Sequence, residues 1–214
     1  MTRKTFLLTM AGAGAVAAQE GPQAPAKFHN YERQSLTVDG FDASGYVLDI
    51  GGGGEGIIGR MKPSQVVAID LYKRELEESP AGPLKIVMDA TDLKFLDASF
   101  DTLTAFYSLM YMKAEIQKKV FAEAARVLKP GGRWLIWDAV IPAALESDTK
   151  GPVFYFEFNL PRETVRTGYG TFWPPKPMDV DWYKALAAEA GLKVALAKEQ
   201  PGAFRTFQME LRKA

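Results

Sequence analysis

The sequence predicts an α/β fold: a three-layer, doubly wound, mostly parallel sheet of seven strands that ends in an antiparallel hairpin. Short apolar segments alternate with helical segments between Val47 and Trp137, a spacing typical of parallel strands joined by right-handed crossovers. The first apolar segment opens into glycines at 51–54. The last two apolar segments are separated by only a few residues, and a loop that short joins only antiparallel strands.

The composition limits both the size of the fold and its chemistry. The chain has 214 residues, of which 47% are hydrophobic and 24% charged, enough for one sizeable core but hardly for two. The formal net charge is +0 without a long basic run, which disfavours nucleic acid as a partner. No cysteine and a single histidine exclude disulfides, thiolate nucleophiles and histidine-rich metal sites. Carboxylates alone could still hold magnesium. We expect a small-molecule partner and no metal.

Residues 1–27 are interpreted as a signal-like leader and linker, and residues 28–214 as one domain. Arg3 and Lys4 form a short positive start, and the uncharged run Thr5–Ala18 contains a small-x-small pattern that signal peptidases accept. This run is too short to span a membrane, so no stable membrane insertion of the mature domain is expected. Export to the periplasm or cell envelope follows, with a cytoplasmic location as the alternative. Sequencing the mature N-terminus distinguishes the two.

The strands and helices of the domain follow from apolar periodicity. Phe28–Asp42 is either a short helix or an extended arm ahead of the first strand, which begins at Val47. Ile57, Ile58 and Met61 follow the glycines at helical spacing. The next strands are Val66–Asp70, Leu84–Met88, Phe100–Phe106 and Trp134–Trp137, and the helices between them include Lys73–Glu78 and Lys113–Leu128.

The C-terminal part predicts a different connection. Val180–Ala190 carries apolar residues on one side and is expected to be a helix. Leu192–Leu196 and Phe204–Leu211 are expected to be strands, and only Lys198–Gly202 separates them. They must therefore pair antiparallel, since a parallel pair needs a crossover of a dozen residues or more.

Acidic residues stand at the ends of three predicted strands. Asp49 lies in the run that leads into the glycines, and Asp70 and Asp89 follow the next two apolar segments. Carboxyl ends of parallel strands meet at one edge of a sheet, and glycines let the backbone approach a ligand closely. The pattern indicates a nucleotide-type cofactor site. Asp70 alone would equally suit the ribose of a nicotinamide cofactor.

Several ordered motifs resemble those of class I S-adenosylmethionine-dependent methyltransferases. They read VLDIGGGG, VVAID, IVMDATDLKFLDASFD and AARVLKPGGRWLI, and together they cover about 47–140. The terminal hairpin extends the resemblance to the C-terminus and implies the Rossmann-like methyltransferase fold. One position departs from the motif: the usual third glycine of the loop falls on Glu55, and Gly56 comes one residue later.

The resemblance implies S-adenosyl-L-methionine as the cofactor and assigns its contacts. Asp70 would accept two hydrogen bonds from the ribose diol, and Leu71 would cover the adenine. Asp89 and the Ala90 amide would contact the adenine edge, and Asp49 would meet the cationic amino group. The contacts beside the methionine end and the methyl group are assigned to Gly51, Gly53 and Tyr107.

Residues 141–177 are interpreted as a substrate lid. This segment is rich in aromatic residues and proline and poor in charge, which suggests a small, partly apolar acceptor. The candidate substrate contacts are Tyr111, Tyr169 and Trp173. Alternation in VFYFEFN leaves open that the segment is instead an added strand.

The function predicted by this resemblance is methyl transfer from S-adenosylmethionine to an unidentified small acceptor. No residue is identified as the catalytic base, and the oligomeric state is not predicted. Two alternatives stay open: a methyltransferase-fold protein that binds without turnover, and an NAD-dependent oxidoreductase. Retention of S-adenosylhomocysteine or of NAD by the purified protein separates the last alternative from the others.

Overall fold

The structure, a computed structural model, describes residues 27–144 and 148–214. The leader predicted for residues 1–27 lies outside the described residues except for Lys27, so its export role stays a prediction. Within the described part of the chain, no helix has both the length and the apolar character needed to cross a membrane.

A seven-stranded sheet forms the centre of the molecule, in the order β10-β11-β7-β6-β3-β4-β5. The strands are β3 (Val47–Ile50), β4 (Val66–Asp70), β5 (Leu84–Val87), β6 (Phe100–Phe106), β7 (Leu128–Ala139), β10 (Leu192–Gln200) and β11 (Thr206–Lys213). All pairs from β7 to β5 are parallel, whereas β11 pairs antiparallel with both β7 and β10. The predicted fold class, a mostly parallel sheet with a terminal hairpin, is confirmed.

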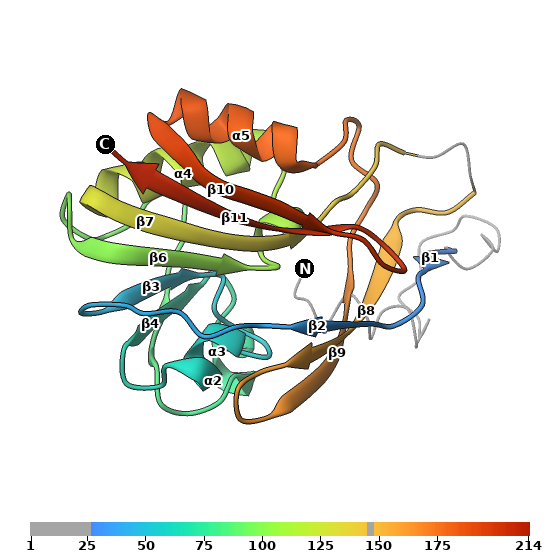
Figure 1. Ribbon diagram of the computed structural model, residues 1–214, viewed down its shortest axis with the longest axis horizontal. Coiled ribbons are helices and arrows are strands. Elements are labelled where there is room, and N and C mark those ends of the chain that lie inside the picture. Colours follow the sequence, from blue (N-terminus) through green and yellow to red (C-terminus); the bar gives the residue numbers. More distant parts are fainter. Residues whose placement is uncertain (1–26, 145–147) are drawn as a thin grey trace, which may run out of the picture.

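The order of the strands places helices on both faces of the sheet. From β3 the chain passes through α2 (Ile57–Met61) to β4 and through α3 (Lys73–Glu78) to β5, toward one edge. From β6 it passes through α4 (Ala114–Val127) to β7, in the opposite direction, and α5 (Val180–Glu189) packs on β10. In Figure 1, α4 and α5 lie together at the top and α2 and α3 at the bottom. The reversal between β3 and β6 is a topological switch point, where α/β sheets bind ligands.

The local sequence explains the central elements. All four residues of β3 are buried, as are the first four of β4, because helices cover both faces of a parallel sheet. In α4, Val120, Phe121, Ala124 and Val127 recur at helical spacing and are buried. The helix ends one residue earlier than predicted, because Leu128 already pairs with Phe100 as the start of β7.

A second, four-stranded sheet lies beside the first (Figure 1). Its central strand β8 (Pro152–Asn159) pairs parallel with β1 (His29–Asn30) and β2 (Gln34–Thr37), and antiparallel with β9 (Thr164–Gly170). The N-terminal segment is thus the extended arm rather than a helix. VFYFEFN forms the added strand that its alternation allowed, since alternate residues face the core.

Candidate functional site

A cavity of about 520 Å³ opens at the carboxyl ends of β3, β4, β5 and β6. Six of the predicted site residues line it: Gly51, Asp70, Leu71, Asp89, Ala90 and Tyr111. They come from four separate segments of the chain. The cavity lies at the switch point, where the predicted cofactor site belongs.

Two backbone hydrogen bonds join the glycine loop, residues 51–54, to β4. The amides of Gly51 and Gly52 both donate to the Ile69 carbonyl, at 2.9 and 3.0 Å. Gly51 has φ +74°, a conformation that favours glycine. A Cβ on Gly52 would lie 2.6 Å from Asp49 Oδ2, so no other residue fits without a shift. The loop therefore presents bare backbone to the cavity at Gly51.

Asp49 lies beneath this loop and is not among the residues that line the cavity. It is 2% exposed, and its Oδ1 accepts a 2.7 Å hydrogen bond from the Thr104 hydroxyl on β6. Asp49 thus supports the loop from the sheet. Its predicted contact with a cofactor amino group stays a prediction.

Asp70 and Leu71 form one wall of the cavity at the end of β4. Asp70 Oδ1 accepts a 2.9 Å hydrogen bond from the Tyr72 amide, which shapes the turn into α3. Leu71 is 55% exposed, an unusual setting for a leucine that a flat ligand would cover. Both residues thus lie at the cavity, and their predicted contacts with an adenosyl group stay predictions.

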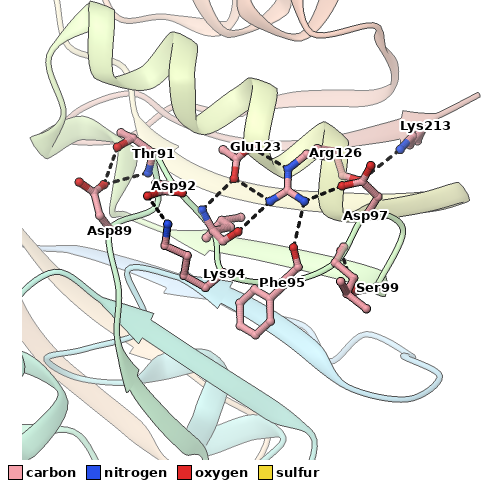
Figure 2. A network of polar contacts seen from close by, with 12 residues as sticks. Asp89, Thr91, Asp92, Lys94, Phe95, Asp97, Ser99, Glu123, Arg126 and Lys213 are labelled. Carbon is pink, nitrogen blue, oxygen red and sulfur yellow. Dashed lines mark hydrogen bonds and ion pairs between the residues drawn. The ribbon is translucent and has the colours of Figure 1, made fainter.

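Asp89 begins a turn at the end of β5, shown in Figure 2. Its Oδ1 accepts hydrogen bonds from the Thr91 amide at 2.8 Å and from the Thr91 hydroxyl at 2.9 Å. These bonds hold Asp89, Ala90 and Thr91 along the cavity wall.

A side-chain network holds the rest of this loop, which contains no helix or strand from residue 88 to residue 99. Arg126 of α4 donates to the carbonyls of Leu93 and Phe95, at 2.8 and 2.9 Å, and pairs with Asp97 and Glu123 (Figure 2). Glu123 also accepts from the Leu93 amide at 2.8 Å. The Arg126 guanidinium lowers the pKa of Glu123 below its usual value, so the pair is ionised at neutral pH. The network joins the loop to α4.

Tyr107 lies outside the cavity wall, in an aromatic cluster between the two sheets. Its ring centroid lies 4.7 Å from that of Phe156 and 5.8 Å from that of Tyr169. It is 2% exposed with φ +47°, and burial raises the pKa of its hydroxyl. The structure therefore brings Tyr107 to the second sheet rather than to the cavity, and its predicted place near the methyl group is untested.

Tyr169 and Trp173 also do not line the cavity. The Tyr169 hydroxyl donates to Glu55 Oε2 at 3.1 Å, and Trp173 Nε1 donates to the Thr149 hydroxyl at 3.1 Å. Glu55, which departs from the expected glycine, thus turns toward β9 and accepts from Thr167 as well, at 2.7 Å. Gly53 is likewise absent from the wall: it packs against α3. The substrate roles of Tyr169 and Trp173 stay predictions.

The cavity wall also contains residues that were not assigned as cofactor or substrate contacts, and three of them, residues 170–172, belong to the segment 141–177 interpreted as a lid. Glu75 and Ser108 approach from α3 and from the end of β6, and Gly170 and Thr171 come from β9 and the residue after it. An apolar side is made by Ile69, Met88, Met112, Ile116, Val120 and Phe172. Helical periodicity marks Ile116 and Val120 only as core, and nothing in the local sequence distinguishes Glu75 from the other glutamates of α3.

The arrangement suits S-adenosylmethionine. The cavity volume falls in the range of about 300–1,000 Å³ typical of small-ligand sites. Carboxylates at two strand ends can accept hydrogen bonds from hydroxyl and amino groups, and the apolar side can hold a flat base. Gly51 admits the remainder of a ligand past the loop.

The comparisons with known proteins agree with this site. Residues 48–136 match the family model described as a methyltransferase domain. The fold has the arrangement of the solved S-adenosylmethionine-dependent methyltransferases, and the cavity lies at its switch point. The segment matched runs from β3 into β7.

Individual relatives are named as methyltransferases. The 27-O-demethylrifamycin SV methyltransferase of Amycolatopsis mediterranei is 32% identical, covering 72% of this chain and 56% of the relative. The ubiquinone/menaquinone biosynthesis C-methyltransferase of Desulfotalea psychrophila is 34% identical, covering 61% and 56%. The chain thus spans about half the length of these relatives. A solved S-adenosylmethionine-dependent methyltransferase from Methanosarcina mazei shares the fold, with a TM-score of 0.57, 18% identity, and coverage of 81% and 94%.

Proposed function

We propose that this protein binds S-adenosyl-L-methionine in the cavity at the switch point and catalyses methyl transfer to a small, partly apolar acceptor. The observation that carries the proposal is the convergence of Gly51, Asp70 and Asp89 on one cavity from three neighbouring strand ends. The family match over residues 48–136 supports the choice of cofactor.

The residues that would hold the cofactor follow from the cavity wall. Asp70 would accept from the ribose, Asp89 and Ala90 would contact the adenine edge, and Leu71 would cover the base. When bound, this cofactor supplies a methyl group on a positively charged sulfur, which is an intrinsically reactive donor. The protein's contribution is therefore to align the acceptor and to exclude water.

The acceptor is proposed from the wall and from the relatives. Tyr111, Met112 and Phe172 give the cavity an aromatic and apolar side suited to a ring-containing molecule. The names of two relatives refer to a demethylrifamycin and to ubiquinone or menaquinone biosynthesis, with transfer to oxygen and to carbon respectively. We propose an acceptor of this general kind, a ring compound with a hydroxyl or an activated ring carbon.

Calorimetric titration tests the cofactor. Wild-type protein is expected to bind S-adenosylhomocysteine and not NAD. Asp70→Asn should weaken that binding about tenfold or more, because charge-assisted hydrogen bonds are lost. Asp39→Asn, a change of the same kind at an exposed position outside the cavity, is the control and should have no effect. Binding of NAD in place of S-adenosylhomocysteine would contradict the proposal.

Turnover is measured separately, with S-adenosylmethionine and a panel of phenols, quinols and macrocyclic alcohols. Formation of S-adenosylhomocysteine that depends on the acceptor would support an enzyme. Tight cofactor binding without turnover on any acceptor would favour the alternative of a binding protein with the methyltransferase fold.

A further inference from the structure

Glu75 differs from the other acidic residues of α3 in where it lies. It is 3% exposed and lines the cavity, whereas Glu77 pairs with Lys73 on the outer face, with side chains 59% and 76% exposed. Burial of a carboxylate costs free energy unless hydrogen bonds or opposite charges compensate it. Glu75 thus brings a carboxylate to the cavity wall from α3, within reach of the polar groups of a ligand.

Glu75 and Asp70 approach the same point of the glycine loop. A Cβ on Gly53 would lie 2.5 Å from Glu75 Cβ and 2.8 Å from Asp70 Oδ2. The Gly54 amide donates to the Glu75 carbonyl at 2.8 Å, which fastens the start of α3 to the loop. The two carboxylate residues thus flank one stretch of loop backbone, and both line the same cavity.

One carboxylate oxygen of Asp70 already accepts a hydrogen bond. Its Oδ1 accepts from the Tyr72 amide at 2.9 Å, and its Oδ2 lies 2.8 Å from the position that a Cβ on Gly53 would take. A ribose diol presents two hydroxyl donors on adjacent carbons. Charge-assisted hydrogen bonds to carboxylates are roughly twice as strong as neutral ones. A second carboxylate would supply such a bond to the second hydroxyl while Asp70 Oδ1 keeps its bond to the Tyr72 amide.

We infer that Glu75 is a second ribose-binding carboxylate, which accepts a hydrogen bond from one hydroxyl of the adenosyl ribose while Asp70 accepts from the other. This inference rests on the proposed function. It assigns the ribose to a pair of acids, one from the end of β4 and one from the first turn of α3.

The test combines isosteric variants with deoxy ligands. The dissociation constants of S-adenosylhomocysteine and of its 2′-deoxy and 3′-deoxy analogues are measured by calorimetry for wild type, Glu75→Gln and Asp70→Asn. Glu75→Gln should weaken binding of S-adenosylhomocysteine about tenfold, because the charge of the acceptor is lost. It should have little effect on the analogue that lacks the hydroxyl bound by Glu75. Asp70→Asn should show the same pattern with the opposite analogue.

Glu77→Gln is the matched control, since it makes the same change two residues away on the exposed face of α3. Its affinities should equal those of wild type. If Glu75→Gln does not fold, as judged by circular dichroism, Glu75→Asp takes its place: it keeps the charge but is one methylene shorter, and the same analogue dependence is expected. Wild type by itself should bind both deoxy analogues more weakly than S-adenosylhomocysteine.

Three results would overturn the inference: equal loss with all three ligands in Glu75→Gln, no loss at all, or a wild-type protein that is indifferent to one of the hydroxyls. Each of these leaves the proposed function standing as long as wild type binds S-adenosylhomocysteine. Failure of wild type to bind that ligand would instead contradict the proposed function itself.

Discussion

At Gly53 the glycine loop and α3 come into their closest contact. A Cβ there would lie 2.5 Å from Glu75 Cβ and 3.0 Å from the Glu75 carbonyl carbon, and backbone cannot move aside as the end of a side chain can. The absence of a side chain at Gly53 therefore sets the distance between the loop and the helix that supplies Glu75.

Gly53→Ala is expected to lower both stability and cofactor affinity. Overpacking of this kind costs about 1–3 kcal/mol, and the displaced helix should reduce the affinity for S-adenosylhomocysteine. Urea unfolding and calorimetric titration measure the two effects. Gly40→Ala is the control, because a Cβ at Gly40 would meet no atom within 4 Å. Equal free energies of unfolding for both variants would show that α3 can shift away from the loop without loss of stability.

At the scale of elements, one helix determines the shape of a loop. Residues 88–99 carry Asp89 and Ala90 to the cavity but form no helix or strand, so side chains of α4 must hold the loop backbone. Arg126 donates to the carbonyls of Leu93 and Phe95, and Glu123 accepts from the Leu93 amide (Figure 2). The adenine edge of the proposed site therefore depends on residues that do not touch it.

The stability that Glu123 contributes should depend on pH. Its pKa is lowered by the hydrogen bond from Arg126, against the opposing effect of burial, and further by the Leu93 amide. A carboxyl group with a lowered pKa stabilises the folded state above its unfolded pKa, about 4.3, and this stabilisation is lost as the pH falls through the folded value. Glu123→Gln should therefore be less stable than wild type at pH 7, by about 1 kcal/mol.

That difference should shrink as the pH is lowered below about 4. Urea unfolding of both proteins from pH 7 downward measures it, with Glu77→Gln as an exposed control on another helix. A gap that stays constant over the whole range would mean that the charge of Glu123 is not what stabilises the loop.

At the scale of the whole molecule, Glu55 and Arg60 join the two sheets. Glu55 accepts from Thr167 and Tyr169 of β9, and Arg60 of α2 pairs with Glu163 at 2.8 Å. The same strand leads into Gly170 and Thr171, which line the cavity. The glycine loop is thus connected through β9 to the opposite wall of the proposed site.

Glu55→Ala should loosen β9 without unfolding the main sheet. The buried Tyr169 hydroxyl loses its acceptor, and amide hydrogen exchange in Thr164–Gly170 should become about tenfold faster or more, corresponding to roughly 1.4 kcal/mol or more of lost protection. Exchange in β3 and β4 should not change. Glu199→Ala is the control. It removes an exposed residue of β10 that pairs with Arg205, and it should leave β9 as in wild type. Unchanged exchange in β9 would mean that Glu55 does not hold the second sheet.

Much of the central sheet could be predicted because its signals are local. The buried runs of β3 and β4, the glycines between β3 and α2, and the short loop of the terminal hairpin all lie within a few residues of the features they predict. The bounds of β7, β10 and β11 were less predictable, because their ladders extend through polar residues as far as the neighbouring strand continues.

The candidate site was only partly predictable, for a related reason. Asp70, Asp89 and Gly51 stand at strand ends, and their neighbours in sequence mark them. Glu75 carries no such mark, since Glu77 and Glu78 share its helix and its chemistry. Aromatic residues such as Tyr169 are as typical of a buried strand face as of a ligand wall, so the alternation around them could not decide between the two.

By itself, the sequence determined the alternation of strands and helices, the direction of the terminal hairpin and the acids at the strand ends, because each depends on backbone propensity and apolar periodicity over a few residues. The tertiary structure alone decided which acids face the cavity, that Asp49 lies beneath the loop rather than in the wall, and that residues 152–170 pair with residues 29–37 in a second sheet tied to Glu55. These features depend on packing between segments far apart in the chain, and local periodicity carries no information about which distant segment will be the neighbour.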